Sequence, residues 1–331
     1  MVNRSANAVM FGFDFQVNAA IVLMLQNIEE LESLRLEGNY EDIEIILDDG
    51  RCIFAQAKAV VKASSDFTNV REKLNHALTT LSEASQKANV KELILITNSL
   101  NPLNVKENIF FGESYRFYFS LPESSKVVID KYIKKIDKPL DLNKFMIQVL
   151  PFETDYDPEK YKIVRQKVDS FIGKLDLSIP GIVDKILDIW QNDIFKNGTK
   201  KDKRIKLKKC DIIWPVICIV TDIDRGDNDW LDIDYELHDE VRVKYKDIIK
   251  TYSEKFELFT RVLYDYNKFE SENRNREKIF DFINKNWKNY KIELSLVNSE
   301  EDLEKALIQV ILYSVLNRRR HINKIKERVK L

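Results

Sequence analysis

The chain has 331 residues, a length that predicts two domains or one domain with a large extension. Hydrophobic residues make up 44% of it, so we expect a packed core and exclude disorder of the whole chain. The 53 Lys and Arg residues almost balance the 54 Asp and Glu residues, so binding to nucleic acid has to come from local charged patches.

Helical and strand patterns alternate along the first 195 residues, which is typical of an α/β fold. The expected elements are, in chain order, a helix at 12–33, strands at 42–47 and 51–57, a helix at 67–87, strands at 92–98, 116–121 and 144–150, and helices at 157–175 and 179–195. Gly and Pro are scarce, at 8 and 7 residues, which favours long helices over a turn-rich β-sandwich. We therefore expect an α/β core with helical additions.

The charge changes sign between residues 196 and 240. Residues 196–209 contain eight Lys or Arg and one Asp, whereas residues 222–240 contain nine acidic residues and one Arg. The apolar segment between them, 210–221, predicts either a buried strand or a short helix. We place a domain boundary near residue 225, between domains of residues 1–225 and 226–331. The second domain is expected to be all-α, with helices at 241–268, 272–288 and 299–328.

Three cysteines, Cys52, Cys210 and Cys218, are far apart and lie in apolar runs. We expect them to be reduced core residues, as in cytoplasmic proteins. The first residues lack the pattern of a signal peptide, and we expect no apolar run that approaches the roughly 20 residues of a membrane span. The expected location is the cytoplasm.

The predicted hairpin carries the polar residues with the clearest chemical meaning. If residues 48–50 form a three-residue loop closed by Gly50 in the left-handed region, Asp42 lies opposite Gln56. This register separates an apolar face from a face that carries Asp42, Glu44, Gln56 and Lys58. A two-residue loop would set Gln56 opposite Ile43 and mix the two faces, so the first register is favoured. The expected apolar face consists of Ile43, Ile45, Leu47, Ile53 and Ala55.

The polar face predicts a metal-dependent site. Mg²⁺ takes hard oxygen ligands and keeps several waters. We expect it to bind the Asp42 carboxylate, the Gln56 side-chain carbonyl and the Ala57 backbone carbonyl, with Mn²⁺ as a substitute. The metal would lower the pKa of a bound water, and Lys58 would orient or help to deprotonate that water, or stabilise the transition state. By spacing alone, an exposed hairpin with scattered polar groups explains these residues equally well.

Motifs on both sides of the hairpin extend this pattern. Gly-Phe-Asp-Phe-Gln at residues 12–16 lies on the first expected helix, and Leu-Ile-Thr-Asn at residues 95–98 ends a strand. Taken with Glu37, Glu-Asp-Ile at 41–43 and Gln-Ala-Lys at 56–58, this order resembles the PD-(D/E)XK nuclease superfamily. More narrowly, it is similar to the endonuclease domain of CBASS effectors, Avs proteins and the nuclease subunit (LmuA) of Lamassu anti-phage systems. The resemblance covers about residues 8–150.

The resemblance assigns roles to five residues. It maps the metal-binding aspartate of the group onto Asp42 and the conserved lysine onto Lys58. Gln56 takes the place of the second acid of the superfamily, as glutamine commonly does in this group. The helix-borne glutamine corresponds to Gln16, and Glu37 matches an acid five positions before the aspartate. A structural role for Gln16 and a surface position for Glu37 stay open, and Glu44 is a further candidate for the site.

The resemblance also implies a restriction-endonuclease-like core and a Mg²⁺-dependent double-stranded DNA endonuclease that serves a bacterial anti-phage complex. Residues 226–331 are too few for the cyclic-oligonucleotide sensor of CBASS effectors. A Lamassu-like subunit, controlled by an SMC-like ATPase and a small accessory subunit, fits the length better. Because one active site cuts one strand, we expect activity to depend on release and homo-oligomerisation. The alternative is a catalytically inactive nuclease-fold adaptor that binds DNA or partner subunits.

Basic residues near the site and in the 196–209 segment are candidates for contacts with DNA phosphates, which supply most non-specific affinity. A solvated loop is the competing interpretation of that segment. The candidates are Lys62, Arg71, Lys73, Lys200, Lys201, Lys203 and Arg204.

Overall fold

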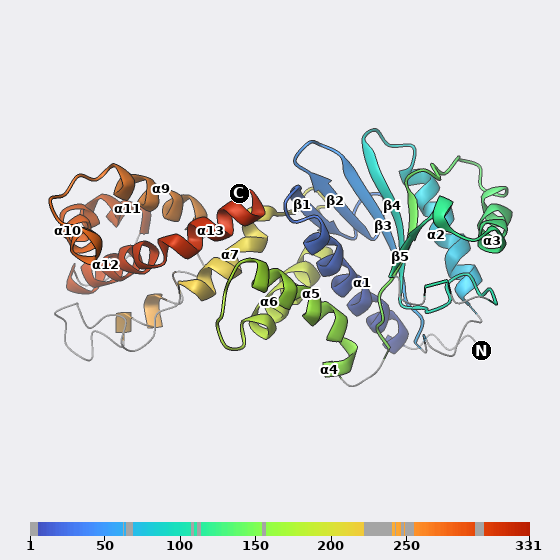
Figure 1. Cartoon of the computed structure of the whole chain (residues 1–331), viewed down its shortest axis with the longest axis horizontal. Coiled ribbons are helices and arrows are strands. Elements are labelled where there is room, and N and C mark those ends of the chain that lie inside the picture. The colour runs from blue at the N-terminus through green and yellow to red at the C-terminus, as the bar shows by residue number, and fades with distance from the viewer. Residues whose placement is uncertain are drawn as a thin grey trace. The chain divides into compact units, whose positions relative to one another are not determined.

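The computed structural model of the chain divides into two compact units, Met1–Ile212 and Ile213–Leu331 (Figure 1). The boundary expected near residue 225 lies outside the residues that the structure describes. The described residues are 6–61, 63, 69–106, 109–110, 114–153, 157–221, 240–241, 243–245, 248, 255–294 and 301–331.

A mixed sheet of seven strands forms the centre of the first unit, in the order β5-β6-β4-β3-β2-β1-β7. The strands are β1 Leu31–Leu36, β2 Ile43–Leu47, β3 Cys52–Lys58, β4 Val90–Thr97, β5 Tyr115–Phe117, β6 Phe145–Val149 and β7 Leu207–Lys208. The β3–β4 and β4–β6 pairs are parallel, and the other pairs are antiparallel. This confirms the expected α/β class with a mixed sheet.

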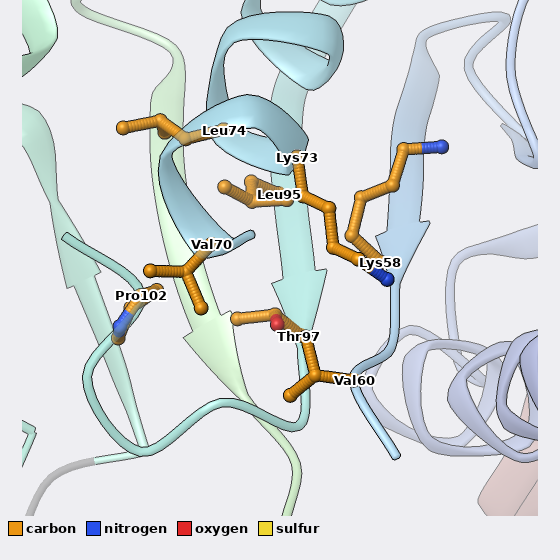
Figure 2. A pocket seen from close by; sticks show the side chains of 8 residues that line it. All are labelled: Lys58, Val60, Val70, Lys73, Leu74, Leu95, Thr97 and Pro102. Atoms are coloured by element: carbon orange, nitrogen blue, oxygen red, sulfur yellow. The ribbon is translucent and has the colours of Figure 1, made fainter. Parts of the chain in front are cut away.

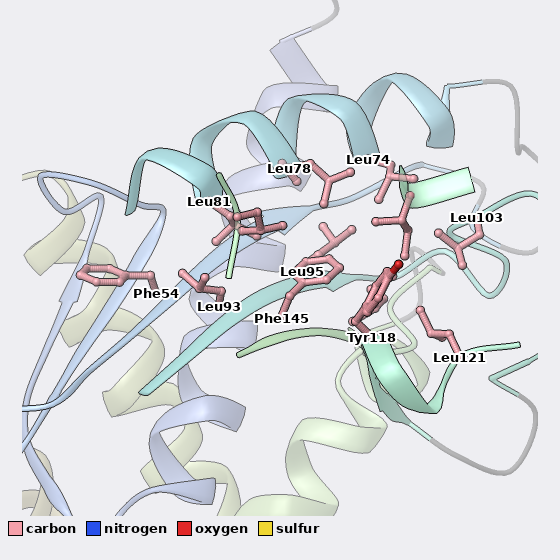
Figure 3. Packing of buried hydrophobic residues seen from close by; sticks show 14 of the residues in the cluster. Phe54, Leu74, Leu78, Leu81, Leu93, Leu95, Leu103, Tyr118, Leu121 and Phe145 are labelled. Atoms are coloured by element: carbon pink, nitrogen blue, oxygen red, sulfur yellow. The ribbon is translucent and has the colours of Figure 1, made fainter. Parts of the chain in front are cut away.

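Helices cover both faces of the sheet. On one face, α1 (Ala6–Gln26) contacts β1 and β3 and packs with α5 (Lys162–Lys174) and α6 (Ile182–Gly198). On the other face, α2 (Val70–Ala84) contacts β3 and β4, and α3 (Glu123–Ile133) packs beside it. Figure 3 shows the leucines of α2 directed at Phe54, Leu93 and Leu95, all of which are nearly or fully buried. This packing fixes α2 directly above the hairpin.

Helix α1 corrects one expectation from the sequence. Its window Asn7–Gln26 is long and apolar enough to cross a membrane by length and composition alone, although no apolar run of that length was expected. Half of this window is buried inside the protein, and Phe15, Ala19 and Ile21 are fully buried. Such burial is the pattern of a core helix in a soluble α/β protein.

Several element boundaries differ from the prediction. The first helix ends at Gln26 rather than at residue 33, because residues 31–36 form β1, an interior strand that the sequence analysis missed. Helix α3 was also missed. The strand predicted at 116–121 is short and continues into the 3-10 helix η1 (Tyr118–Ser120), and the helix predicted at 157–175 is divided into α4 (Asp157–Lys160) and α5. Segment 210–221 belongs to helix α7 (Lys209–Val220).

The described part of the second unit is helical, as expected. Its elements, after the end of α7, are α9 Lys255–Lys268, α10 Asn275–Asn286, η2 Trp287–Tyr290, α11 Lys291–Leu294, α12 Glu301–Asn317 and α13 Arg319–Val329. Helix α12 is buried over most of its circumference and contacts α9 and α10, so it forms the centre of this unit. The three cysteines, which all lie in described segments and form no disulfide there, are partly exposed, so the expectation that they are core residues is wrong.

Candidate active site

The β2–β3 hairpin has the predicted register. Ile43 pairs with Ala55 and Ile45 with Ile53, and the Leu47 N–H donates to the Arg51 carbonyl at 2.9 Å. Gly50 closes the three-residue loop with a φ of 78°, in the left-handed region that glycine adopts without strain. By this register Asp42, which immediately precedes β2, lies across from Gln56.

Asp42 and Lys58 meet at the end of the hairpin. Lys58 Nζ lies 3.6 Å from Asp42 Oδ2, and the side chains are 21% and 17% exposed. The same carboxylate oxygen accepts the Ala57 N–H at 3.0 Å. The Asp42 side chain therefore accepts the hydrogen bond of β3 that a β2 backbone carbonyl would otherwise accept. This bond holds the carboxylate beside the Lys58 ammonium group at a partly open strand end.

A tight turn before β2 positions Glu37 and Asp42. The Glu37 N–H donates to the Asp42 carbonyl at 2.7 Å, and Glu44 Oε1 accepts the Tyr40 N–H at 2.6 Å. An added Cβ at Gly38 would lie 2.1 Å from Glu44 Cδ, so the turn requires glycine there. Glu44, a candidate for the site on sequence grounds, thus holds the turn in place.

Glu37 and Gln16 lie next to Asp42. Burial and the neighbouring Asp42 charge raise the pKa of Glu37, whereas a hydrogen bond from Gln16 and the charges of Lys203 and Lys58 lower it. The Gln16 side chain is thus directed at the Glu37 carboxylate, and its own Oε1 is buried without a hydrogen-bond partner. The structure brings Gln16, Glu37, Asp42 and Lys58 into one electrostatic cluster.

Packing of α1 explains the aromatic residues of the first motif. Phe15 is fully buried, and its ring lies 5.6 Å from that of Phe152. Asp14 Oδ2 pairs with Lys160 Nζ at 2.6 Å. These contacts fix the rotation of α1 and with it the direction of Gln16, so the aromatic positions of the motif have a structural role.

Gln56 differs from the expectation of an open polar face. It is 2% exposed, and its Oε1 accepts a hydrogen bond from Thr80 Oγ1 of α2 at 2.9 Å. Phe54, on the same face of β3, packs into the core under α2. Helix α2 therefore covers most of the face that was predicted to be polar, and only its Asp42–Lys58 end is accessible.

Glu41, to which the sequence analysis gave no role, also lies close to Asp42 and Lys58. It is 5% exposed, and both of its carboxylate oxygens are buried without a hydrogen-bond partner. Burial, and then the Asp42 charge, raises the pKa of Glu41 to about 8, while Lys58 and Thr80 act in the opposite direction. Its signal in the sequence was its place in the Glu-Asp-Ile motif at residues 41–43, directly before Asp42.

A small pocket opens beside Lys58. Its volume is about 10 Å³, which is room for about one water molecule and not for a substrate. Figure 2 shows the Lys58 and Lys73 side chains at its edge, with their ammonium groups directed apart. Lys73 Nζ donates to the Ala59 carbonyl, so this predicted DNA-binding residue is engaged in fixing the end of β3.

The 196–209 segment reaches the site from far along the chain. The guanidinium of Arg35, which is almost fully buried, donates to the backbone carbonyls of Asn197, Lys200 and Ile205. Lys203 Nζ in turn donates to the Gly38 carbonyl, in the turn that carries Glu37. A buried arginine on β1 thus attaches this basic segment to the rim of the site.

The other predicted phosphate-binding residues lie in varied surroundings. Lys200 and Lys201 are exposed, and Arg204 Nη2 pairs with Asp202 at 2.9 Å. Arg71 Nη2 donates to the Asn104 carbonyl at 3.0 Å. Lys62 lies outside the described residues.

Within the described segments, no three His, Cys, Asp or Glu side chains are arranged to hold a metal ion. A metal at this site would therefore depend on the Asp42 carboxylate together with neutral oxygens, water or rearranged neighbours. Comparisons of the chain with protein-family models, curated proteins and solved structures found no match. The relation to PD-(D/E)XK nucleases accordingly stays a resemblance of motifs.

Proposed function

We propose that the protein is a Mg²⁺-dependent endonuclease of the PD-(D/E)XK type that cleaves double-stranded DNA. The observation that carries this proposal is the Asp42–Lys58 pair at 3.6 Å, held at an accessible end of an antiparallel hairpin. Glu37 and Gln16, which the resemblance to the nuclease motifs assigns to the same site, lie beside this pair. A carboxylate and an ammonium group in this arrangement suit phosphodiester hydrolysis.

The residues present fit a hard divalent cation. Asp42 offers a carboxylate at a partly open position, and Mg²⁺ needs only one or two protein carboxylates because it keeps several waters. The N–H and C=O of a strand residue lie on the same side of the strand, so the Ala57 carbonyl is directed toward Asp42 as well. Gln56 would join the site only after its amide leaves Thr80. Bound Mg²⁺ or Mn²⁺ would supply an activated water and neutralise phosphate charge.

Lys58 has two tasks in this proposal. Its ammonium stabilises the negative charge that develops on the phosphate, and it orients the attacking water by donating a hydrogen bond to the water oxygen. The pairing with Asp42 keeps the ammonium at the site before substrate arrives. Such preorganisation lowers the reorganisation that the reaction requires.

The basic segment supplies the affinity for DNA. Arg35 fixes the backbone of residues 197–205, which holds Lys203 at the turn of Glu37 and leaves Lys200 and Lys201 exposed nearby along the chain. Lysines that contact phosphates release condensed counterions, which favours binding irrespective of sequence. We expect little sequence preference in the cleavage.

The biological setting follows from the motif resemblance. We propose an effector subunit of a bacterial anti-phage complex, similar to the Lamassu nuclease subunit, which an SMC-like ATPase and a small accessory subunit control. The helical second unit would bind the partner subunits. Duplex breaks need two active sites, so release from the complex and homo-oligomerisation would activate cleavage. A monomer that linearises plasmid DNA at full rate would refute that requirement.

One observation favours the rival function, an inactive adaptor. The Gln56 amide is buried and bonded to Thr80, so the second expected ligand is not free for a metal in this conformation. An adaptor would keep the fold and the basic 196–209 segment at the rim of the site, but would not cleave DNA.

A plasmid-cleavage assay separates the two functions. Wild type should nick or linearise DNA in Mg²⁺ and not in EDTA, and Asp42→Asn or Lys58→Ala should lower the rate by roughly 100-fold or more. Lys131→Ala, on the exposed surface of α3, is the matched control and should cleave like wild type. Equal results for all four proteins, with and without Mg²⁺, would favour the adaptor.

A further inference from the structure

Neither oxygen of the Glu41 carboxylate has a hydrogen-bond partner within normal geometry. Both of its oxygens are buried, although the residue lies between Asp42 and a surface turn. The Thr80 hydroxyl, which lies close enough to lower the pKa of Glu41, has one proton, and its acceptors are Gln56 Oε1 at 2.9 Å and the Ala77 carbonyl at 3.2 Å. The Lys58 ammonium, which also lowers this pKa, pairs with Asp42. Both groups that favour the charged form of Glu41 therefore have other partners.

A buried acid without a partner calls for a physical explanation. Burying a carboxylate is unfavourable by several kcal/mol unless a donor or a cation compensates it. Proteins keep such groups mainly where an ion, a water or a reaction uses them. Glu41 is only 5% exposed, and its charge interacts with both Asp42 and Lys58, so an ion at that pair would compensate it.

The local backbone allows Glu41 and Asp42 to act together. Side chains of adjacent residues in a strand point to opposite faces. Residues 39–42 form a bend before β2 begins at Ile43, so this alternation does not apply to them. The Gly38 N–H donates to the Glu41 carbonyl at 3.0 Å, and the Glu41 N–H donates to Glu44 Oε1 at 3.3 Å. These bonds fix the backbone of Glu41 beside the Asp42–Lys58 pair.

Resting on the nuclease function proposed above, we propose that Glu41 provides the second carboxylate for the divalent cation at Asp42. The resemblance to the nuclease motifs assigns that second ligand position to Gln56, a neutral amide whose oxygen already accepts a hydrogen bond from Thr80 of α2. A Glu41–Asp42 pair gives the cation two negative charges from adjacent residues, which suits a hard divalent ion better than one carboxylate and two neutral oxygens. Gln56 then has a supporting role, since it holds Thr80 and α2 against the site.

Metal binding tests this inference without reference to cleavage. Titration calorimetry with MnCl₂ on the full chain compares wild type, Glu41→Gln, Asp42→Asn and Glu32→Gln. Glu32 is an exposed residue of β1, so its variant makes the same change of charge away from the site. We expect Glu41→Gln and Asp42→Asn to weaken Mn²⁺ binding by about 10-fold or more, and Glu32→Gln to bind like wild type.

Thermal unfolding gives a second readout. In EDTA at pH 7, Glu41→Gln should unfold at or above the temperature of wild type, because the amide removes an uncompensated acid. At the same concentration, added Mg²⁺ should raise the unfolding temperature of wild type and of Glu32→Gln more than that of Glu41→Gln.

Three outcomes would overturn the inference, and they differ from one another. If Glu41→Gln binds Mn²⁺ like wild type while Asp42→Asn loses it, Glu41 is not a ligand and the metal site of the proposed function stands. If Glu41→Gln does not fold in EDTA, Glu41 is a structural residue. If wild type binds no Mn²⁺ at millimolar concentration, the proposed metal-dependent function falls together with the role of Glu41.

Discussion

The clearest stability prediction concerns Glu41 in the absence of metal. Burial raises the pKa of Glu41 in the folded chain to about 8, from the ordinary value of 4.5 for a glutamate side chain. Between these two values the folded state binds a proton that the unfolded state has already released. The free energy of unfolding therefore falls as pH rises through this window, and Glu41→Gln removes this part of the pH dependence.

The magnitude follows from the two pKa values. The raised pKa of Glu41 lowers the free energy of unfolding by close to zero below pH 4.5, by about 3 kcal/mol at pH 7 and by at most about 5 kcal/mol above pH 8. Glu41→Gln and wild type should thus be similarly stable at pH 5, and the variant should be more stable by a few kcal/mol at pH 8. Burial also raises the pKa of Glu37. The free energy of unfolding of Glu41→Gln should therefore still fall with rising pH, with a smaller slope than that of wild type.

Urea unfolding in EDTA at pH 5, 6, 7 and 8 measures this difference. The relevant transition is the one that Glu41→Gln shifts, since a chain of two units need not unfold in a single step. Glu32→Gln is the control and should follow wild type at every pH. Parallel pH profiles for wild type and Glu41→Gln would refute the reasoning, because they would mean that Glu41 ionises as it does in the unfolded chain.

Three further predictions concern the basic segment and the hairpin turn. Arg35→Ala removes three buried charge-assisted hydrogen bonds to backbone carbonyls, of which the Lys200 carbonyl accepts no other hydrogen bond from the described residues, and should destabilise the chain by about 3 kcal/mol, with faster hydrogen exchange in residues 198–206. Arg204→Ala removes an ion pair with Asp202 at the protein surface. It should leave both the free energy of unfolding and the hydrogen exchange of residues 198–206 near wild type. Replacing Lys200, Lys201 and Lys203 together by alanine should weaken DNA binding and lower the salt slope of log K by up to about 3, and an unchanged slope would exclude contacts with phosphates. Gly50→Ala should destabilise the hairpin by roughly 1 kcal/mol, whereas Gly50→Asn should be tolerated better, because asparagine adopts a positive φ more readily than alanine.

The hairpin could be predicted well because its constraints are local. The alternation of Ile43, Ile45 and Ile53 with polar residues defined the register, and Gly50 defined the loop. Strand β1 was missed because it lies between β2 and β7 and is buried on both faces. Its leucines therefore lack strand alternation, and Leu31 also fits the helical spacing of the segment before it.

The burial of the site could not be predicted, since it depends on contacts between distant segments. Thr80 reaches Gln56 only because α2 packs over β3 through its leucines. Arg35 fixes a segment more than 160 residues further along the chain, and this places Lys203 at the turn of Glu37. The burial of Glu41 could not be predicted either, because it depends on the bend at residues 39–42 and on the packing around it.

The most direct test of the central claim is the position of a bound metal. Anomalous scattering from a crystal grown with MnCl₂ should show one peak about 2.0–2.3 Å from an Asp42 carboxylate oxygen, with Glu41 as a second ligand and Lys58 Nζ nearby. Clear density for the hairpin with no peak at Asp42, or with Mn²⁺ bound only at unrelated acids, would contradict a metal-dependent nuclease site in this protein.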